Sequence, residues 1–241
     1  MPSTKQYYQK KLREKKQEFD ILKKITETIA YNLNLDQVLK LIVDTVQKYT
    51  KSDSCFVYLI KKNKVILEAS QNPHGPVLGK IQMKLGEGIT GWVAKNKKTV
   101  SLNSKAYQDK RFKSFKNILP EDKFEAFLSF PIIYKNQTVG VINVQHVKAK
   151  RYNKDRVAFL EIIARLLGGV IENARLMQET NILKEALETR KLIDKAKSIL
   201  MENSGITEAQ AHKLINKKSM DKRKSLKEIA EAIILSQEIL S

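Results

Sequence analysis

The feature that most constrains this chain is the stretch from Asn153 to Asn203, which contains no proline and in which apolar residues recur at alternating spacings of three and four. This spacing places them on a narrow stripe of one helix, as in a coiled-coil seam. A monomer would leave the stripe in water, so we expect residues 153–190 to form a connecting coiled-coil helix in a parallel homodimer. The stripe comprises Leu160, Ile163, Leu167, Val170, Ala174 and Met177, and resumes after a phase shift at Leu183 and Leu187.

Two further features bear on this helical region. Gly168 and Gly169 weaken a helix by about 1 kcal/mol each relative to alanine, or else permit close approach of another helix. Near the N-terminus, a second narrow stripe is formed by Phe19, Leu22, Thr26 and Ile29. We expect residues 1–34 to contain an N-terminal coiled-coil helix that joins the same bundle.

The middle of the chain has the patterns of a sheet. Short apolar segments at 55–60, 64–70 and 80–85 are followed by a glycine-rich turn, a short helix carrying Trp92, and strands at 99–102 and 126–147. Turn residues at Lys62-Asn63 and Lys135-Asn136-Gln137 predict two hairpins. We therefore expect an α+β fold, in which an antiparallel sheet with flanking helices precedes the long helix.

The C-terminal end predicts a small helical bundle. Gly205 suits the left-handed position that ends a helix. Thr207 with Gln210, and Ser225 with Glu228, have the spacing of two capping boxes, in which a hydroxyl and a later side chain satisfy unpaired backbone N–H groups. We expect a three-helix bundle whose first helix is the end of the long one.

The charge points to an anionic partner. The chain of 241 residues has a formal net charge of +19, which favours nucleic acid first and an anionic membrane surface second. A solvated lysine surface is the alternative. Lys217, Lys218, Lys222, Arg223 and Lys224 crowd one end of the C-terminal unit, more cations than a helix C-terminus requires.

Other classes of protein are disfavoured. The single cysteine, Cys55, lies in an apolar run and excludes an internal disulfide framework. His74, His146 and His212 have no metal-binding spacing, and no nucleophile–base pair is recognisable, so we expect a protein without metal or cofactor that is not an enzyme. The N-terminus lacks an apolar leader and no run is long enough to span a membrane, which predicts a cytoplasmic location.

Residues 183–240 resemble the ANTAR domain, the three-helix RNA-binding module of bacterial transcription antiterminators. This resemblance rests on Arg190, Ile193, Ala196-Lys197, Leu200-Met201, Gly205, Ala211, Leu214, Ser219-Met220, Arg223, Leu226 and Ile229-Ala230.

The ANTAR resemblance implies where RNA would bind and assigns residues 183–241 to this domain. Two positions depart from the family pattern: Ser198 replaces the usual glycine, and Asn216-Lys217 replaces paired arginines. A lysine meets phosphate as a point charge but lacks the bidentate fork of arginine. The implied RNA face is Arg190, Lys197, Ser198, Asn216, Lys217, Ser219, Lys222 and Arg223.

Residues 35–175 resemble a GAF domain through the segment LGEGITGWVAKNKKTV and the strand pair FLSFPIIYKNQTVGVINVQH. GAF domains bind small molecules or dimerise, and the resemblance names no ligand. We expect the loop from Tyr107 to Phe115 to cover a pocket, although ordinary core packing is the commoner role for such residues. The candidate lining is Tyr58, Trp92, Phe112, Phe127 and Asn143.

Together the resemblances imply a dimeric regulator in which a GAF sensor controls binding to paired RNA stem-loops in a nascent leader. Stabilising those loops prevents a terminator hairpin from forming, so RNA polymerase is affected indirectly. Two alternatives stay open: a DNA-binding regulator that places a helix in the major groove, and a ligand-dependent GAF scaffold for a protein partner.

Overall fold

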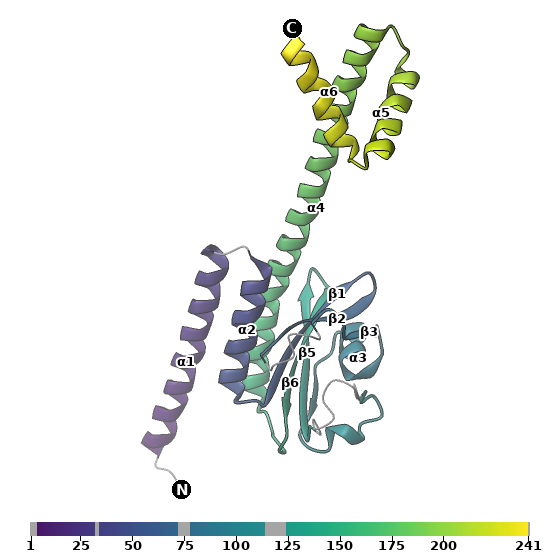
Figure 1. Cartoon of the computed structure of the whole chain (residues 1–241). Helices are drawn as coiled ribbons and strands as arrows, with labels where there is room; N and C mark the ends of the chain where they lie inside the picture. The colour runs from purple at the N-terminus through teal and green to yellow at the C-terminus, as the bar shows by residue number, and fades with distance from the viewer. Residues whose placement is uncertain (1–3, 32–33, 72–77, 114–123, 241) are drawn as a thin grey trace. The chain divides into compact units, whose positions relative to one another are not determined.

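The computed structural model describes residues 4–31, 34–71, 78–113 and 124–240 (Figure 1). The chain divides into two compact units, residues 1–174 and 175–241, here called the sheet unit and the helical unit. Each is described by itself, and helix α4 contributes residues to both. The helices are α1 (Thr4–Tyr31), α2 (Leu35–Thr50), α3 (Gly88–Asn96), α4 (Lys154–Ser204), α5 (Glu208–Lys222) and α6 (Leu226–Leu240), with a 3-10 turn η2 (Ala106–Gln108).

The sheet is antiparallel and has the strand order β3-β2-β1-β6-β5-β4. Both predicted hairpins are confirmed, although Gln137, expected in the second turn, is the first residue of β6. Lys62-Asn63 and Lys135-Asn136 all have positive φ, as two-residue hairpin turns with the right twist require. The strands are β1 (Ser54–Lys61), β2 (Lys64–Ser70), β3 (Gln82–Lys84), β4 (Val100–Leu102), β5 (Ala126–Tyr134) and β6 (Gln137–His146).

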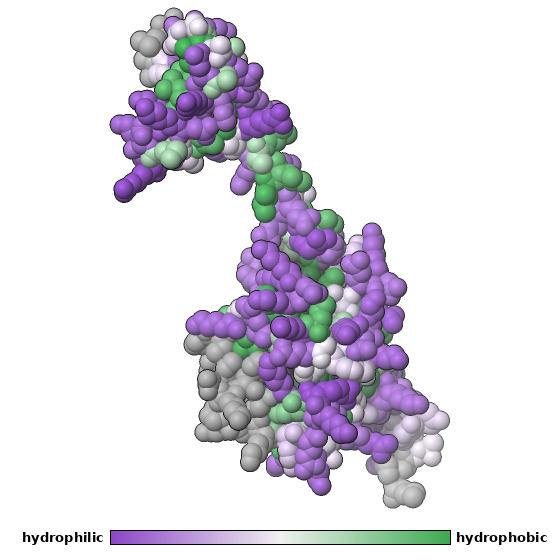
Figure 2. Space-filling model, turned by 90° about the vertical axis from the view of Figure 1, so that its right-hand side faces the viewer, coloured by the Kyte–Doolittle hydropathy of each residue, from purple (hydrophilic) through white to green (hydrophobic). Residues whose placement is uncertain are grey.

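The sheet separates two hydrophobic clusters, and alternate residues of β1 enter each of them. Cys55, Val57 and Leu59 face the cluster that also contains α2 and the first turns of α4. Phe56 and Tyr58 face the cluster that contains α3. Because β1 is covered on both faces, its first six residues are all buried. The surface visible in Figure 2 is largely hydrophilic.

The glycine-rich turn before α3 depends on two different properties of glycine. Gly86 and Gly88 adopt φ values of +88° and +70°, which side chains rarely allow. Gly91 has ordinary φ, but a Cβ there would lie 2.5 Å from the Lys84 carbonyl oxygen. This turn brings α3 close to β3 of the sheet.

Helix α1 packs against the core with a face that overlaps only partly with the predicted stripe. Ile25 is fully buried, with Ile21, Leu22 and Ile29 beside it against the core. Phe19 is 67% exposed, so it lies outside this contact. Glu18 is buried, and its carboxylate accepts a hydrogen bond of 2.7 Å from the Tyr49 hydroxyl of α2. The N-terminal coiled coil stays a prediction.

The first part of the long apolar stripe has an intramolecular partner. Leu160, Ile163 and Leu167 are fully buried in the cluster formed with α2 and the sheet, and Val170 is 9% exposed. The expectation that a monomer leaves these residues in water is therefore wrong. Gly168 makes the contact with the sheet possible, because a Cβ there would lie 2.7 Å from the Ile133 carbonyl oxygen.

The burial of Cys55 leads to a simple labelling prediction. Its thiol is fully buried, and burial raises its pKa because the thiolate is poorly solvated there. We expect a thiol-specific reagent at pH 8 to label the chain completely in concentrated urea and hardly at all in native buffer over the same interval. Fast labelling of the native chain, followed by absorbance or mass, would contradict this packing.

Candidate nucleic-acid interface

The helical unit is organised by local capping. Gly205 has a φ of +62° and ends α4. At α5 the Thr207 hydroxyl accepts from the Gln210 N–H while the Gln210 side chain accepts from the Thr207 N–H, which confirms the first capping box. Ser225 and Glu228 form the same reciprocal pair at α6. These caps fix where each helix begins, and hence which side chains face inward.

The three helix segments enclose one small hydrophobic core. Its buried members come from all three: Ala196 of α4, Ile215 of α5, and Ile229, Ala230 and Ile234 of α6. The predicted three-helix bundle is thus confirmed, with the last turns of α4 as its first helix.

The positive charge of this unit is local. Residues 175–241 contain 13 lysines and arginines against 10 acids, so the unit carries little of the total +19. Between His212 and Ser225, however, the sequence has six lysines and arginines and one acid, Asp221. An anionic ligand is therefore expected at this cluster, and the overall charge of the unit does not by itself call for one.

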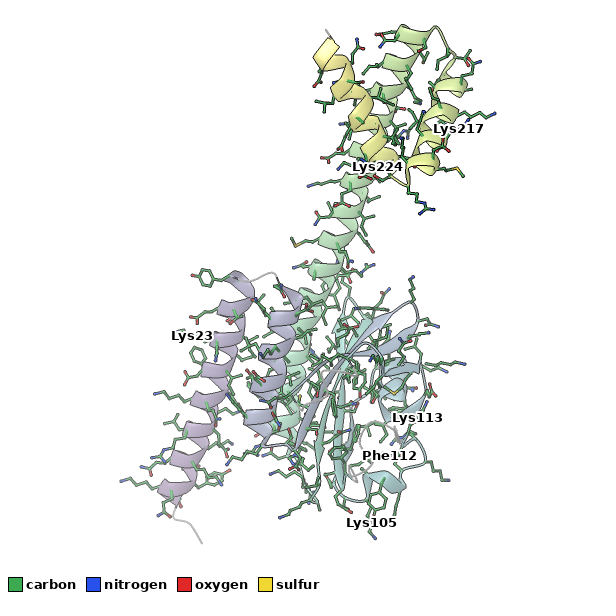
Figure 3. The ribbon with its side chains drawn as sticks, viewed as in Figure 1. Lys23, Lys105, Phe112, Lys113, Lys217 and Lys224 are labelled. Atoms are coloured by element: carbon green, nitrogen blue, oxygen red, sulfur yellow. The ribbon has the colours of Figure 1, made fainter. Side chains whose placement is uncertain are left out.

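Three of the predicted RNA-face residues are free to meet a ligand. Lys217, Lys222 and Arg223 are exposed and form no ion pair within the part of the chain that the structure describes. Lys217 projects outward from α5 (Figure 3). Arg223 occupies the left-handed position that ends α5, with a φ of 52°.

Lys197 is already paired. Its ammonium lies 2.7 Å from a carboxylate oxygen of Asp194 and 2.7 Å from one of Glu208, and its side chain is only 14% exposed. Hydrogen bonds to these carboxylates raise its pKa. Lys197 therefore joins α4 to α5, and a contact with RNA would require it to leave both acids.

The remaining predicted residues make local contacts. The Arg190 side chain is 83% exposed, 3.9 Å from Asp194. The Ser198 hydroxyl donates to the Asp194 carbonyl at 3.2 Å, and the Asn216 amide lies 3.2 Å from His212 Nδ1. The Ser219 hydroxyl donates to the Lys224 carbonyl at 2.6 Å, which closes the end of α5. Ser219 is thus engaged by the backbone.

The structure adds two cations that the predicted RNA face omitted. Lys218 and Lys224 line a groove together with Lys222, between α5 and α6. Lys224 lies where the two helices connect (Figure 3). The spacing of Leu214, Lys218 and Lys222 could have indicated Lys218, because residues four apart share a helix face. Lys224 lies in a turn, where spacing carries no such signal.

The five candidate pocket residues of the sheet unit all lie on the α3 side of the sheet, where they form a packed cluster. Tyr58 and Phe127 are buried in it, with Trp92 and Phe112 against its edge. The Asn143 amide donates to the Thr90 hydroxyl at 2.7 Å and accepts from the Ser129 hydroxyl at 2.7 Å.

Desolvation raises the pKa of Tyr58, although its hydrogen bond to Asn143 works in the other direction. The expected covering loop lies partly outside the described residues, since these end at Lys113 on that side. A ligand pocket there stays a prediction.

Metal sites and membrane-spanning helices are two other features that the described residues can be examined for. Within ranges 4–31, 34–71, 78–113 and 124–240, no three His, Cys, Asp or Glu side chains gather as metal ligands would. None of the helices in these ranges combines the length and apolar character needed to cross a membrane.

Comparison with known proteins relates both units to established families. A GAF-domain family model matches residues 32–172, and an ANTAR-domain model matches residues 182–234. The GAF domain of a phosphoenolpyruvate-protein phosphotransferase from Coxiella burnetii superposes with a TM-score of 0.62 and 26% identity, covering 67% of this chain and 96% of that structure.

Two curated relatives are regulatory proteins. The nitrate regulatory protein of Klebsiella oxytoca is 40% identical over 87 residues, 34% of this chain and 22% of that protein. The transcriptional regulatory protein PdtaR of Mycobacterium tuberculosis is 43% identical over 56 residues, 23% of this chain and 27% of that protein. The chain thus spans about a quarter of the length of these relatives. It belongs to the GAF-domain family and carries an ANTAR domain after its GAF domain.

Proposed function

We propose that this chain is a cytoplasmic, non-enzymatic regulator of transcription antitermination that binds RNA stem-loops through its ANTAR domain. The observation that carries the proposal is an ANTAR match at residues 182–234 that coincides with a cluster of exposed cations at the end of α5. Such a cluster binds an RNA backbone favourably, because each phosphate that it neutralises releases counterions. The names of the matched relatives, a nitrate regulatory protein and a transcriptional regulatory protein, support a regulatory role.

In the proposed mechanism, Lys217, Lys222 and Arg223 hold the phosphates of a stem-loop in a nascent leader. Binding stabilises that stem-loop at the expense of a competing terminator hairpin, so RNA polymerase reads through. The GAF domain receives the controlling signal. A ligand for it would lie on the α3 side of the sheet, near Tyr58 and Asn143, where aromatic and polar groups meet.

The proposal includes a parallel homodimer held by the later part of the predicted stripe, because the earlier part is buried against the sheet. Leu176, Thr180, Leu183 and Leu187 follow the spacing four, three, four, and the three leucines are 46%, 70% and 54% exposed. Figure 2 shows hydrophobic residues at the surface of this stretch. Two copies would bury this stripe in a coiled coil, and two bundles could then engage paired loops with avidity.

Leu183→Glu should break this dimer. A carboxylate on the seam would be desolvated beside its copy, so we expect dimer dissociation to become about 100-fold easier. The matched control is Ile182→Glu, because Ile182 is also exposed, at 58%, but lies about 100° around the helix from Leu183. Light scattering over a concentration series measures both variants. Equal behaviour of the two variants, or a monomeric wild type, would remove the dimer from the proposal.

The proposed function is tested by binding to transcripts that carry paired stem-loops, at two salt concentrations and against double-stranded DNA. We expect loop transcripts to bind more tightly than fully paired RNA, and the DNA duplex to compete poorly. A steep salt dependence without loop preference would indicate charge alone. Displacement of RNA by low concentrations of duplex would instead favour a DNA-binding regulator, and no nucleic-acid binding would favour a GAF scaffold.

A further inference from the structure

A groove of about 550 Å³ lies within the helical unit, between α5 and α6. Its two edges are rows of residues four apart, which is the spacing that places side chains one above another on a helix. Leu214, Lys218 and Lys222 form the edge on α5. The opposite edge, on α6, consists of Glu228, Ala232 and Ser236.

The groove is open because two of the three residues on its second edge have short side chains. Ala232 and Ser236 are both exposed and leave the space above them unfilled. The floor is apolar, with Ile215 only 1% exposed, Ile229 8% exposed, and Leu200 and Ile233 half-buried beside them. A ligand seated here would therefore contact hydrocarbon along its whole inner face.

The rim of the groove is cationic. Lys218, Lys222 and Lys224 form no ion pair within the described ranges. Glu228 is the one acid on the rim, and its carboxylate accepts from both the backbone N–H and the hydroxyl of Ser225 at 2.8 Å. These bonds lower the pKa of Glu228, so its charge is held at the helix cap. The partner that fits is apolar where it enters, and anionic at its edges.

Resting on the proposed function, we infer that this groove receives one unpaired nucleobase of an RNA loop, with the flanking phosphates on Lys218, Lys222 and Lys224. A loop supplies bases that are free to leave the stack, whereas a paired stem does not. The volume lies within the range of about 300–1,000 Å³ typical of sites that enclose small ligands. The apolar floor takes the role that stacked aromatic rings have in sheet-based RNA-binding modules.

Two contributions to RNA binding can therefore be separated: contacts to the backbone, and selection of a loop over a stem. Cations outside the groove, such as Lys217, would hold any RNA backbone, while the groove would distinguish a loop from a stem. Filling the groove should therefore remove the loop preference and leave the affinity for paired RNA intact.

The test is Ala232→Phe, which places a ring over the groove floor from an exposed position. The matched control is Leu235→Phe, because Leu235 lies on the same helix, is 58% exposed and does not line the groove. We expect Ala232→Phe to weaken binding of the loop transcript at least tenfold, with an unchanged affinity for a fully paired stem of the same length. The control should stay within twofold of wild type for both RNAs.

Two further measurements keep the test decisive. Thermal unfolding followed by circular dichroism shows whether Ala232→Phe folds, and Ser236→Phe offers a second way to fill the groove. A 2-aminopurine placed at each loop position in turn should change its fluorescence on binding wild type at one position, and should not do so with Ala232→Phe.

The outcomes distinguish this inference from the proposed function. If folded Ala232→Phe and Ser236→Phe keep the loop preference of wild type, the groove assignment is wrong and the proposed function stands. If wild type itself shows no affinity for loop RNA, both are wrong. If filling the groove changes only self-association, the groove belongs to a second copy of the chain and the base assignment is overturned.

Discussion

A chain carrying Lys217→Glu, Lys222→Glu and Arg223→Glu is expected to lose RNA affinity on the order of 100-fold at physiological salt. The physical reason is that three exposed cations would become three anions facing the phosphates. The magnitude of the salt slope, log Kd against log salt concentration, should fall by about 2–3, because each phosphate contact contributes about 0.7–0.9 to it. Titration of labelled stem-loop RNA at several salt concentrations measures both quantities.

The matched control for this triple reversal changes the same charge elsewhere. Lys40, Lys48 and Lys98 are exposed, lie in the sheet unit, and have no ion pair among the described residues. Their replacement by Glu should reduce affinity far less than the α5 reversal, through the long-range field alone. Equal losses in the two triple variants would mean that overall charge, rather than the cluster at the end of α5, binds the RNA.

Gly168→Ala is expected to destabilise the sheet unit by about 1–3 kcal/mol, the usual range for forcing atoms into a packed core. The added Cβ would lie 2.7 Å from the Ile133 carbonyl oxygen, which is closer than a carbon can approach, so α4 or β5 must move. Urea unfolding measures the change in free energy, with labelling of buried Cys55 as an independent probe of the same unit.

Gly169→Ala is the control, one residue along the same helix. Apart from the neighbouring helix backbone, no atom of the described residues lies within 4 Å of a Cβ added there, so the substitution should stabilise the helix by about 0.5–1 kcal/mol through its higher helix propensity. The two variants should therefore change stability in opposite directions. A Gly168→Ala protein at least as stable as wild type would show that α4 does not approach β5 as described.

Those elements that depend on local chemistry were predictable from the sequence. The hairpin turns at Lys62-Asn63 and Lys135-Asn136, the caps at Thr207 and Ser225, and the helix end at Gly205 all follow from residues within a few positions of one another. Whether a residue can adopt a positive φ, and whether an unpaired backbone N–H finds an acceptor, depends on neighbours along the chain. The order of these elements was enough to predict the fold class.

The partner of an apolar stripe was not predictable in the same way. Leu160, Ile163 and Leu167 have the spacing of a dimer seam, yet they are buried against the sheet of their own chain. Leu183 and Leu187 continue the helix with the same chemistry and remain exposed. Spacing specifies which residues share a helix face, whereas the segment that covers that face is set by contacts distant in sequence.

In the candidate RNA site, too, one part was predictable from the sequence and another depended on the tertiary structure. The sequence by itself was sufficient to locate a cationic cluster at the end of α5, because the family pattern and the charges are contiguous. Tertiary structure decided that Lys197 is held between Asp194 and Glu208, and that Lys218 and Lys224 border an apolar groove. Whether a lysine is free or paired, and whether a row of small side chains leaves a hollow, depends on which helix faces it across the bundle, and that is a property of packing rather than of order along the chain.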